Sequence, residues 1–193
     1  MKRLIISIFA FFVLCLSSFA QSEHLTFKGI PIDGSLEAYV NKMKKAGFEY
    51  VGEADDAAMF KGEFAGYKNC SIGVITLKKY DLVNRVSVLF QTTDSWQELY
   101  ANYTSLQKML TKKYGKPADT VELFEGDFQP GDDMDRMREL RMDRCKIYTV
   151  FTLPKGTIQL EIIKGVLSGG SVRLSYWDKL NTWVIEEKAM EDL

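Results

Sequence analysis

Side chains suited to a protein core recur at every second position in four short stretches of this chain, and this period of two sets its fold class. In an extended strand such a period places alternate side chains on opposite faces, so one face is buried and the other meets solvent. Turn-like residues at 153–156 and 168–170 separate strands. The stretches contain Ile72, Val74 and Thr76; Val86, Val88 and Phe90; Ile158, Leu160 and Ile162; and Val172, Leu174 and Tyr176. The sequence therefore predicts half-buried strands of antiparallel sheet.

Two other segments have the period of an amphipathic helix. Residues 35–46 carry apolar side chains three or four positions apart, and Gly47 is a natural stop. Residues 94–114 repeat this pattern over a longer span, with Ser95 and Glu98 at the spacing of a capping box. We expect a helix in each segment.

The two pairs of strands resemble each other at a fixed distance along the chain. Adding 86 to the numbers of Ile72, Val74, Val86 and Val88 leads to apolar positions of the second pair, whereas Gly47 and Gly115 are 68 residues apart. The difference, 86 − 68 = 18, is almost the length of residues 126–143, which lie between the second helix and its strands. We predict an α+β fold of two tandem units, each a helix packed on an antiparallel β-meander: residues 21–93 and residues 94–193, the second with an insertion at 126–143.

The predicted insertion is dense in charge. Residues 126–145 contain four arginines and six acidic residues, but the acids do not follow a calcium-loop pattern, because the third ligand and the turn glycine are missing. A salt-bridged turn or short helix is expected, with Met134, Met137 and Leu140 on one side. The segment has few apolar residues, so we expect folding to tolerate its removal. Its arginines Arg136, Arg138 and Arg141 are candidates for contact with a partner, the alternative being a merely solvated segment.

The first twenty residues have the layout of a secretory signal peptide. A basic start is followed by an apolar run at 4–16 and by small residues at the −3 and −1 positions of a cut before Gln21. The run is shorter than the ~20 residues that a bilayer requires. We therefore predict an exported protein, periplasmic or extracellular, that begins at Gln21 and has no later membrane span.

Charge and composition narrow the partners. Removal of residues 1–20 takes away Lys2 and Arg3, leaving 23 basic against 26 acidic residues and a net charge of −3. This weak acidity and the lack of a basic stripe argue against nucleic acid as a partner. With 46% hydrophobic and 12% aromatic residues, the chain has enough apolar material for a substantial core.

Cys70 and Cys145 are the cysteines of the mature chain, and two interpretations of them stay open. An oxidising compartment permits a disulfide between them, and two separate buried thiols are the alternative. Two cysteines and one histidine do not supply a zinc site of the usual spacing, and no metal or cofactor is expected.

Catalytic motifs are missing from the sequence. The single histidine, His24, follows the predicted cleavage site by four residues, where we expect an exposed and frayed terminus rather than a rigid catalytic site. Two acidic residues facing each other across a cleft would still permit an envelope hydrolase such as a glycosidase. Trp177 and Trp183 form an aromatic cluster that suits either packing or stacking on a sugar or peptide.

The order of helix and sheet, over residues 25–178, resembles small exported bacterial modules of the beta-lactamase inhibitor protein type, in which such units occur in tandem. Residues 27–34, before the first helix, also look like the entry of secreted proteins of Gram-negative bacteria. The resemblance is architectural and implies a binding or structural role. We therefore expect a non-catalytic exported module that binds another envelope or secreted protein or a cell-envelope component, with the hydrolase as the alternative.

Overall fold

A computed structural model describes residues 23–191 except 55, 78–79, 127–129 and 167. The predicted signal peptide lies outside these residues. The described residues form β1 (Thr26–Phe27), β2 (Ile30–Pro31), α1 (Leu36–Lys45), β3 (Glu49–Ala54), β4 (Ala57–Phe64), β5 (Tyr67–Leu77), β6 (Leu82–Leu89), α2 (Trp96–Tyr114), β7 (Asp119–Phe124), α3 (Asp133–Arg141), β8 (Cys145–Leu153), β9 (Gly156–Lys164), β10 (Gly170–Asp178) and α4 (Lys179–Met190). The fold is therefore α+β, as predicted. Among the described residues, no helix is long and apolar enough to cross a membrane.

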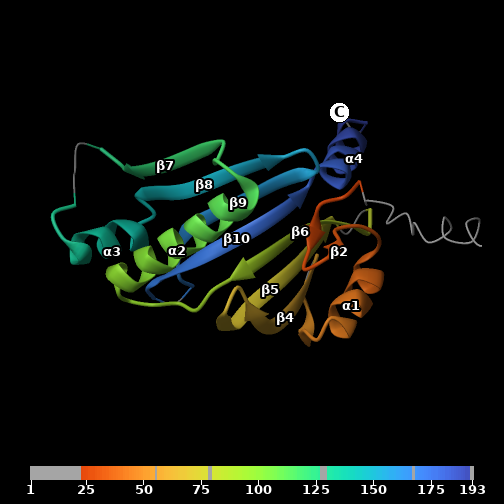
Figure 1. The fold of residues 1–193 in the computed structure, drawn as a ribbon, viewed down its shortest axis with the longest axis horizontal. Coiled ribbons are helices and arrows are strands. Elements are labelled where there is room, and N and C mark those ends of the chain that lie inside the picture. The colour runs from red at the N-terminus through yellow and green to blue at the C-terminus, as the bar shows by residue number, and fades with distance from the viewer. Residues whose placement is uncertain (1–22, 55, 78–79, 127–129, 167, 192–193) are drawn as a thin grey trace, which may run out of the picture.

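One antiparallel sheet organises the molecule (Figure 1). Its eight strands lie in the order β3-β4-β5-β6-β10-β9-β8-β7, and β1 and β2 form a separate two-stranded sheet. The chain thus makes two four-stranded meanders whose last strands, β6 and β10, lie side by side in the middle. α1 precedes the first meander and α2 the second.

The core lies between the sheet and the helices α1, α2 and α3. Residues that face each other across the central strands are buried together: Ile72 pairs with Val88, Val88 with Leu174, and Leu174 with Leu160. α1 contributes Tyr39, Val40 and Met43 to this core, and α2 contributes Trp96, Leu99, Tyr103, Leu106 and Leu110. Both predicted helices are confirmed. Burial of apolar area on this one face supplies most of the driving force for the fold.

The N-terminus of α2 shows how the predicted capping box is altered. The Ser95 hydroxyl accepts a hydrogen bond from the Glu98 backbone N–H at 3.3 Å. In a capping box the Glu98 carboxylate would accept a hydrogen bond from the Ser95 backbone N–H. Here it accepts one from the Thr93 hydroxyl at 2.7 Å instead, and the Ser95 N–H donates to Thr93 Oγ1. A third side chain thus completes the cap.

The four predicted strands correspond to β5, β6, β9 and β10, but the proposed constant shift of 86 residues does not hold for their pairing. Ile72 pairs with Val88, so this shift would pair Ile158 with Leu174. Ile158 pairs instead with Tyr176, two residues further on. Because the difference is an even number, every side chain keeps its face of the sheet.

The segment predicted to be an insertion, residues 126–143, lies between β7 and β8 and contains α3, which confirms a short helix. The expectation that it adds little to the core was wrong. Met137 and Leu140 are 4% and 3% exposed and belong to the main core, whereas Met134 is 79% exposed. Their spacing of three residues places both on the side of α3 that packs against α2 and the sheet. Replacement of the segment by a short turn is therefore expected to destabilise the fold.

Gly170, at the start of β10, explains how α2 and α3 approach the sheet so closely. A Cβ atom at this position would lie 2.5 Å from Leu99 Cδ2 and 2.6 Å from Leu140 Cδ2. The preceding Gly169 has a φ of +65° and makes the turn. The pair therefore has two roles, a turn and a close contact.

The disulfide considered between Cys70 and Cys145 is not present, and both thiols are free. Cys70 lies in β5 and Cys145 in β8, with β6, β10 and β9 between them. Four strand spacings amount to roughly 19 Å, far beyond the Cα separation that a disulfide spans. The alternative of two separate thiols describes this structure.

Candidate functional site

The face of the sheet opposite α1, α2 and α3 carries a mixed polar and aromatic surface, which we call the open face. Its side chains alternate with the core residues of the same strands, and they are half-buried or exposed apart from small buried serines in β10. Ser87 and Ser175 pair at its centre, with their hydroxyls 2.9 Å apart. On either side of this pair lie Arg85 with Trp177 and Leu89 with Arg173.

At the end of the open face nearer α3, charged side chains surround a hollow of about 480 Å³. Arg173 donates from Nε to Glu161 at 2.9 Å, and Tyr148 stands opposite Glu161 on the next strand. Lys146 and Lys164 also line the hollow. Of the side chains at this end of the open face, Arg173 and Tyr148 belong to types enriched at protein-binding surfaces, whereas lysines and acids are depleted there.

At the other end, a pocket of about 390 Å³ lies between the strands and α4. Three open-face residues that pair in a row, Thr152, Thr157 and Trp177, form its strand side. Thr182 and Trp183 line it from α4. We call this the tryptophan pocket. The structure thus brings together the two tryptophans that the sequence analysis considered for ligand contact, and Trp183 is 54% exposed.

Arg85 lies against Trp177, the residue it pairs with across the sheet. Its guanidinium carbon is 4.3 Å from the centre of the Trp177 ring, a cation–π contact. Burial lowers the pKa of Arg85, and the nearby charge of Arg173 lowers it further, while Glu161 opposes both effects. The Nε atom of Arg85 is buried without a hydrogen-bond partner among the described residues. Arg85 thus fixes one face of the Trp177 ring.

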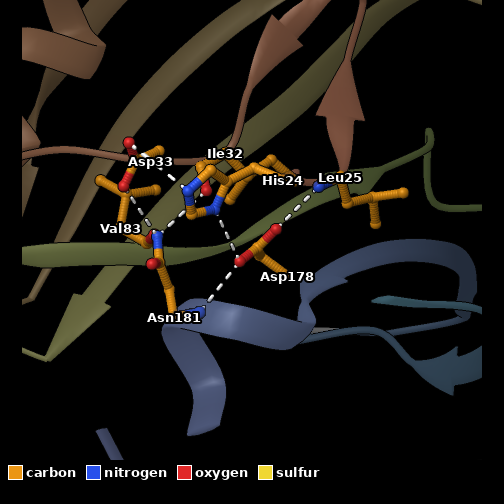
Figure 2. A network of polar contacts seen from close by, with 7 residues as sticks. All are labelled: His24, Leu25, Ile32, Asp33, Val83, Asp178 and Asn181. Carbon is orange, nitrogen blue, oxygen red and sulfur yellow. Dashed lines mark hydrogen bonds and ion pairs between the residues drawn. The ribbon is translucent and has the colours of Figure 1, made fainter. Parts of the chain in front are cut away.

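A buried carboxylate, Asp178, fixes the start of α4 (Figure 2). It is fully buried and accepts three hydrogen bonds: from the Leu25 N–H at 2.7 Å, from the Asn181 N–H at 2.9 Å and from His24 Nδ1 at 3.0 Å. Asp178 is therefore both the N-cap of α4 and an anchor for the N-terminal segment.

Asn181 makes the second half of this anchor. Its side-chain amide donates to the backbone oxygens of Ile32 at 3.1 Å and Val83 at 2.8 Å, and to the carboxylate of Asp33 at 3.2 Å. These acceptors come from the segment after β2 and from β6. The first turn of α4, which precedes Thr182 and Trp183, is thereby held against two distant parts of the chain.

His24 was expected to be an exposed terminal residue, and this expectation was wrong. Its side chain is 21% exposed and lies between two acids: Nδ1 contacts Asp178, and Nε2 is 3.7 Å from Asp33 Oδ2 (Figure 2). A histidine that activates a nucleophile needs one ring nitrogen directed at a hydroxyl or thiol. Here both nitrogens face carboxylates, which is the arrangement of a structural bridge.

The arginines of α3 lie at the far end of the sheet from α4 (Figure 1) and bind acids of their own chain. Arg136 contacts Asp133 at 2.9 Å, Arg138 contacts Asp135 at 2.8 Å, and Arg141 contacts Asp94 at 3.1 Å. Each pair is substantially exposed, so each contributes little to stability. Their predicted role in partner contact stays a prediction.

Four residues of the site were not predicted from the sequence: Arg85, Arg173, Tyr148 and Thr182. Arg85 directly precedes Val86, and Arg173 lies between Val172 and Leu174, so both alternate with predicted core residues. The period of two predicted that both arginines lie on the face of the sheet opposite the core. It could not reveal that α1, α2 and α3 all leave that face uncovered. Thr182 gave no signal, because α4 was not predicted.

No protein family, curated protein or solved structure was found to match this chain.

Proposed function

We propose that this protein is a non-catalytic exported module that binds another protein or a component of the cell envelope through the open face of its sheet. The observation that carries this proposal is the composition of that face, on which Trp177, Tyr148, Arg85 and Arg173 gather while α1, α2 and α3 lie on the other side. Tryptophan, tyrosine and arginine are the residues most enriched among those that dominate binding energy at protein interfaces.

In the tryptophan pocket, the disposition of the acids supports binding rather than hydrolysis. Asp178 is fully buried and engaged by three donors, and Glu186, the other acid of the tryptophan pocket, is exposed on α4. A glycosidase requires two carboxylates that both reach the scissile bond. A buried Asp178 is unsuited to that role.

The proposal also includes the tandem origin of the fold. The sheet order supports it, because each meander has four strands, follows its own helix and ends at the centre of the sheet. Ser87 and Ser175 would be equivalent positions, 88 residues apart, that meet on the axis relating the two units. The segment with α3 would then be an insertion in the second unit.

Affinity capture from an envelope extract tests the binding role. Mature protein starting at Gln21 is compared with a Tyr148→Ala/Gln159→Ala variant, which changes two half-buried side chains of the open face on β8 and β9. We expect specific partners, identified by mass spectrometry, to be lost from this variant and kept by Lys112→Ala, a change on the exposed side of α2. Equal capture by all three proteins would contradict the proposal.

A further inference from the structure

The tryptophan pocket offers flat apolar surfaces beside hydroxyl groups. Trp177 and Trp183 present indole rings from a strand and from a helix, and Thr152, Thr157 and Thr182 present their side chains around them. The volume of about 390 Å³ lies within the range of pockets that hold small ligands, ~300–1,000 Å³. The pocket therefore suits a compact molecule with both an apolar face and a polar edge.

The charges at the pocket favour a neutral ligand. Its lining contains one basic and one further exposed acidic side chain, Lys179 and Glu186, which offset each other, while Asp178 is fully occupied by its three donors. A cationic ligand stacked on Trp177 would also meet a ring that already contacts the guanidinium of Arg85.

Thr152 and Thr157 supply hydroxyl groups on the strand side of the pocket. They lie opposite each other on β8 and β9, and Thr152 is exposed while Thr157 is half-buried. A hydroxyl both donates and accepts a hydrogen bond, so either group can bind a hydroxyl of a ligand. Thr182 Oγ1, in contrast, is buried beyond the reach of a ligand in the pocket.

We propose that the tryptophan pocket binds a neutral carbohydrate ring, stacked on Trp183 and hydrogen-bonded to Thr157. A hexose in its chair form has an apolar face of C–H groups and hydroxyls around its edge, which matches the indoles and the threonines of this pocket. The proposal rests on the proposed binding function and names the class of envelope component recognised at one end of the open face.

Titration of the mature protein with defined neutral saccharides tests this inference. We use chitotetraose, maltotetraose and cellotetraose, each up to about 10 mM, and follow binding by calorimetry and by tryptophan fluorescence. At least one should give saturable binding. Trp183→Ala should weaken that binding by about tenfold or more, the usual loss for one stacking ring.

Thr157→Val removes the hydroxyl and keeps the shape of the side chain. It should weaken saccharide binding by about fivefold with an unchanged melting temperature, because both residues suit a β-strand. Thr157→Ser should retain most of the affinity, because it keeps the hydroxyl. Glu187→Ala, an exposed change on α4 outside the pocket, is the matched control and should bind as the wild type does.

Two results would overturn the inference. One is a lack of saturable binding by all three saccharides, and the other is equal binding by wild type and Trp183→Ala. A peptide that binds in their place and is lost from Trp183→Ala would make the pocket a peptide site. If saccharides fail while capture through the open face persists, only this inference falls; loss of both removes the proposed function as well.

Discussion

α3 and α4 lie at opposite ends of the sheet and use their side chains in opposite ways (Figure 1). α3 is dense in charge, yet its charges pair within the chain and its apolar residues Met137 and Leu140 enter the core. α4 has no clear apolar side, yet a buried polar network fixes its first turn and Trp183 stays exposed. A conspicuous charge pattern therefore marks a structural helix here, and the helix with the weaker sequence pattern presents the candidate binding residue.

The largest effect is expected from Leu140→Ala in α3. Removal of a fully packed leucine should lower the free energy of unfolding by about 2–5 kcal/mol, because a cavity is left between α2, α3 and the sheet. Met134→Ala, three quarters exposed on the same helix, is the control and should change stability by less than about 0.5 kcal/mol. Equal denaturation midpoints for the two variants would show that α3 does not contribute to the core.

Asp178→Ala should have the next largest effect and act on α4. The change removes the helix cap and leaves the buried N–H groups of Leu25 and Asn181 without their acceptor, at a cost of about 2–3 kcal/mol. Thermal unfolding followed by circular dichroism measures it. Asp33→Ala serves as the comparison, since Asp33 is 44% exposed and Asn181 keeps two backbone acceptors. A stability of Asp178→Ala no lower than that of Asp33→Ala would contradict the anchoring role.

Arg141→Ala should have a much smaller effect. Its contact with Asp94 joins two side chains that are 51% and 67% exposed, so the loss should stay below about 0.5 kcal/mol. The same holds for Arg136→Ala, whose contact is within one helical turn. Urea denaturation of the single and double variants tests this. Cooperative losses above about 1 kcal/mol would mean that the charges of α3 act as a network rather than as isolated pairs.

The smallest effect at neutral pH concerns Cys145, just after α3. Burial raises the pKa of the Cys145 thiol to about 11, and the charges of Asp143 and Glu139 add to the shift. Between about pH 9 and 11 the unfolded chain loses this proton while the folded chain keeps it, so the contribution to stability present below pH 9 is lost as the pH rises. Cys145→Ser should match wild type in stability at pH 7 and fall less steeply above pH 9.

Thiol reactivity measures the same shift directly. In a Cys70→Ser background, Cys145 should react slowly with iodoacetamide at pH 8, because little thiolate is present in the folded protein, and the rate should rise toward pH 11. A rate at pH 8 equal to that of the denatured chain would contradict the raised pKa.

The elements that could be predicted from the sequence are those with a strict periodicity of apolar residues within one segment. α2 and the four central strands have a strict periodicity because one face of each is fully buried. β8 was missed although Ile147, Thr149 and Phe151 alternate in it, since it directly follows the charged segment. The edge strands β3 and β7 bury few side chains and leave little pattern to detect.

The candidate site could be predicted only in part. Trp177 and Trp183 were considered because aromatic residues are conspicuous, but their shared pocket depends on the path of α4. That path is set by contacts of Asp178 and Asn181 with residues about 100 to 150 positions away. No local pattern reports such a contact, and for the same reason the role of His24 was misjudged.

The separation between Leu25 and Asp178 has a consequence for the time course of folding. The hydrogen bond between them spans 153 residues, and Phe27 likewise packs against Tyr176. At a synthesis rate of about 5–20 residues per second, the acceptor appears roughly 8–30 seconds after the donor. During that interval the first described residues lack the Asp178 carboxylate and the Tyr176 ring, although Phe27 can already pack against Phe48 and Phe64. Contacts of such long sequence separation are associated with slow folding. The packing of the amino-terminal segment is therefore completed only after the last strand, β10, has been made.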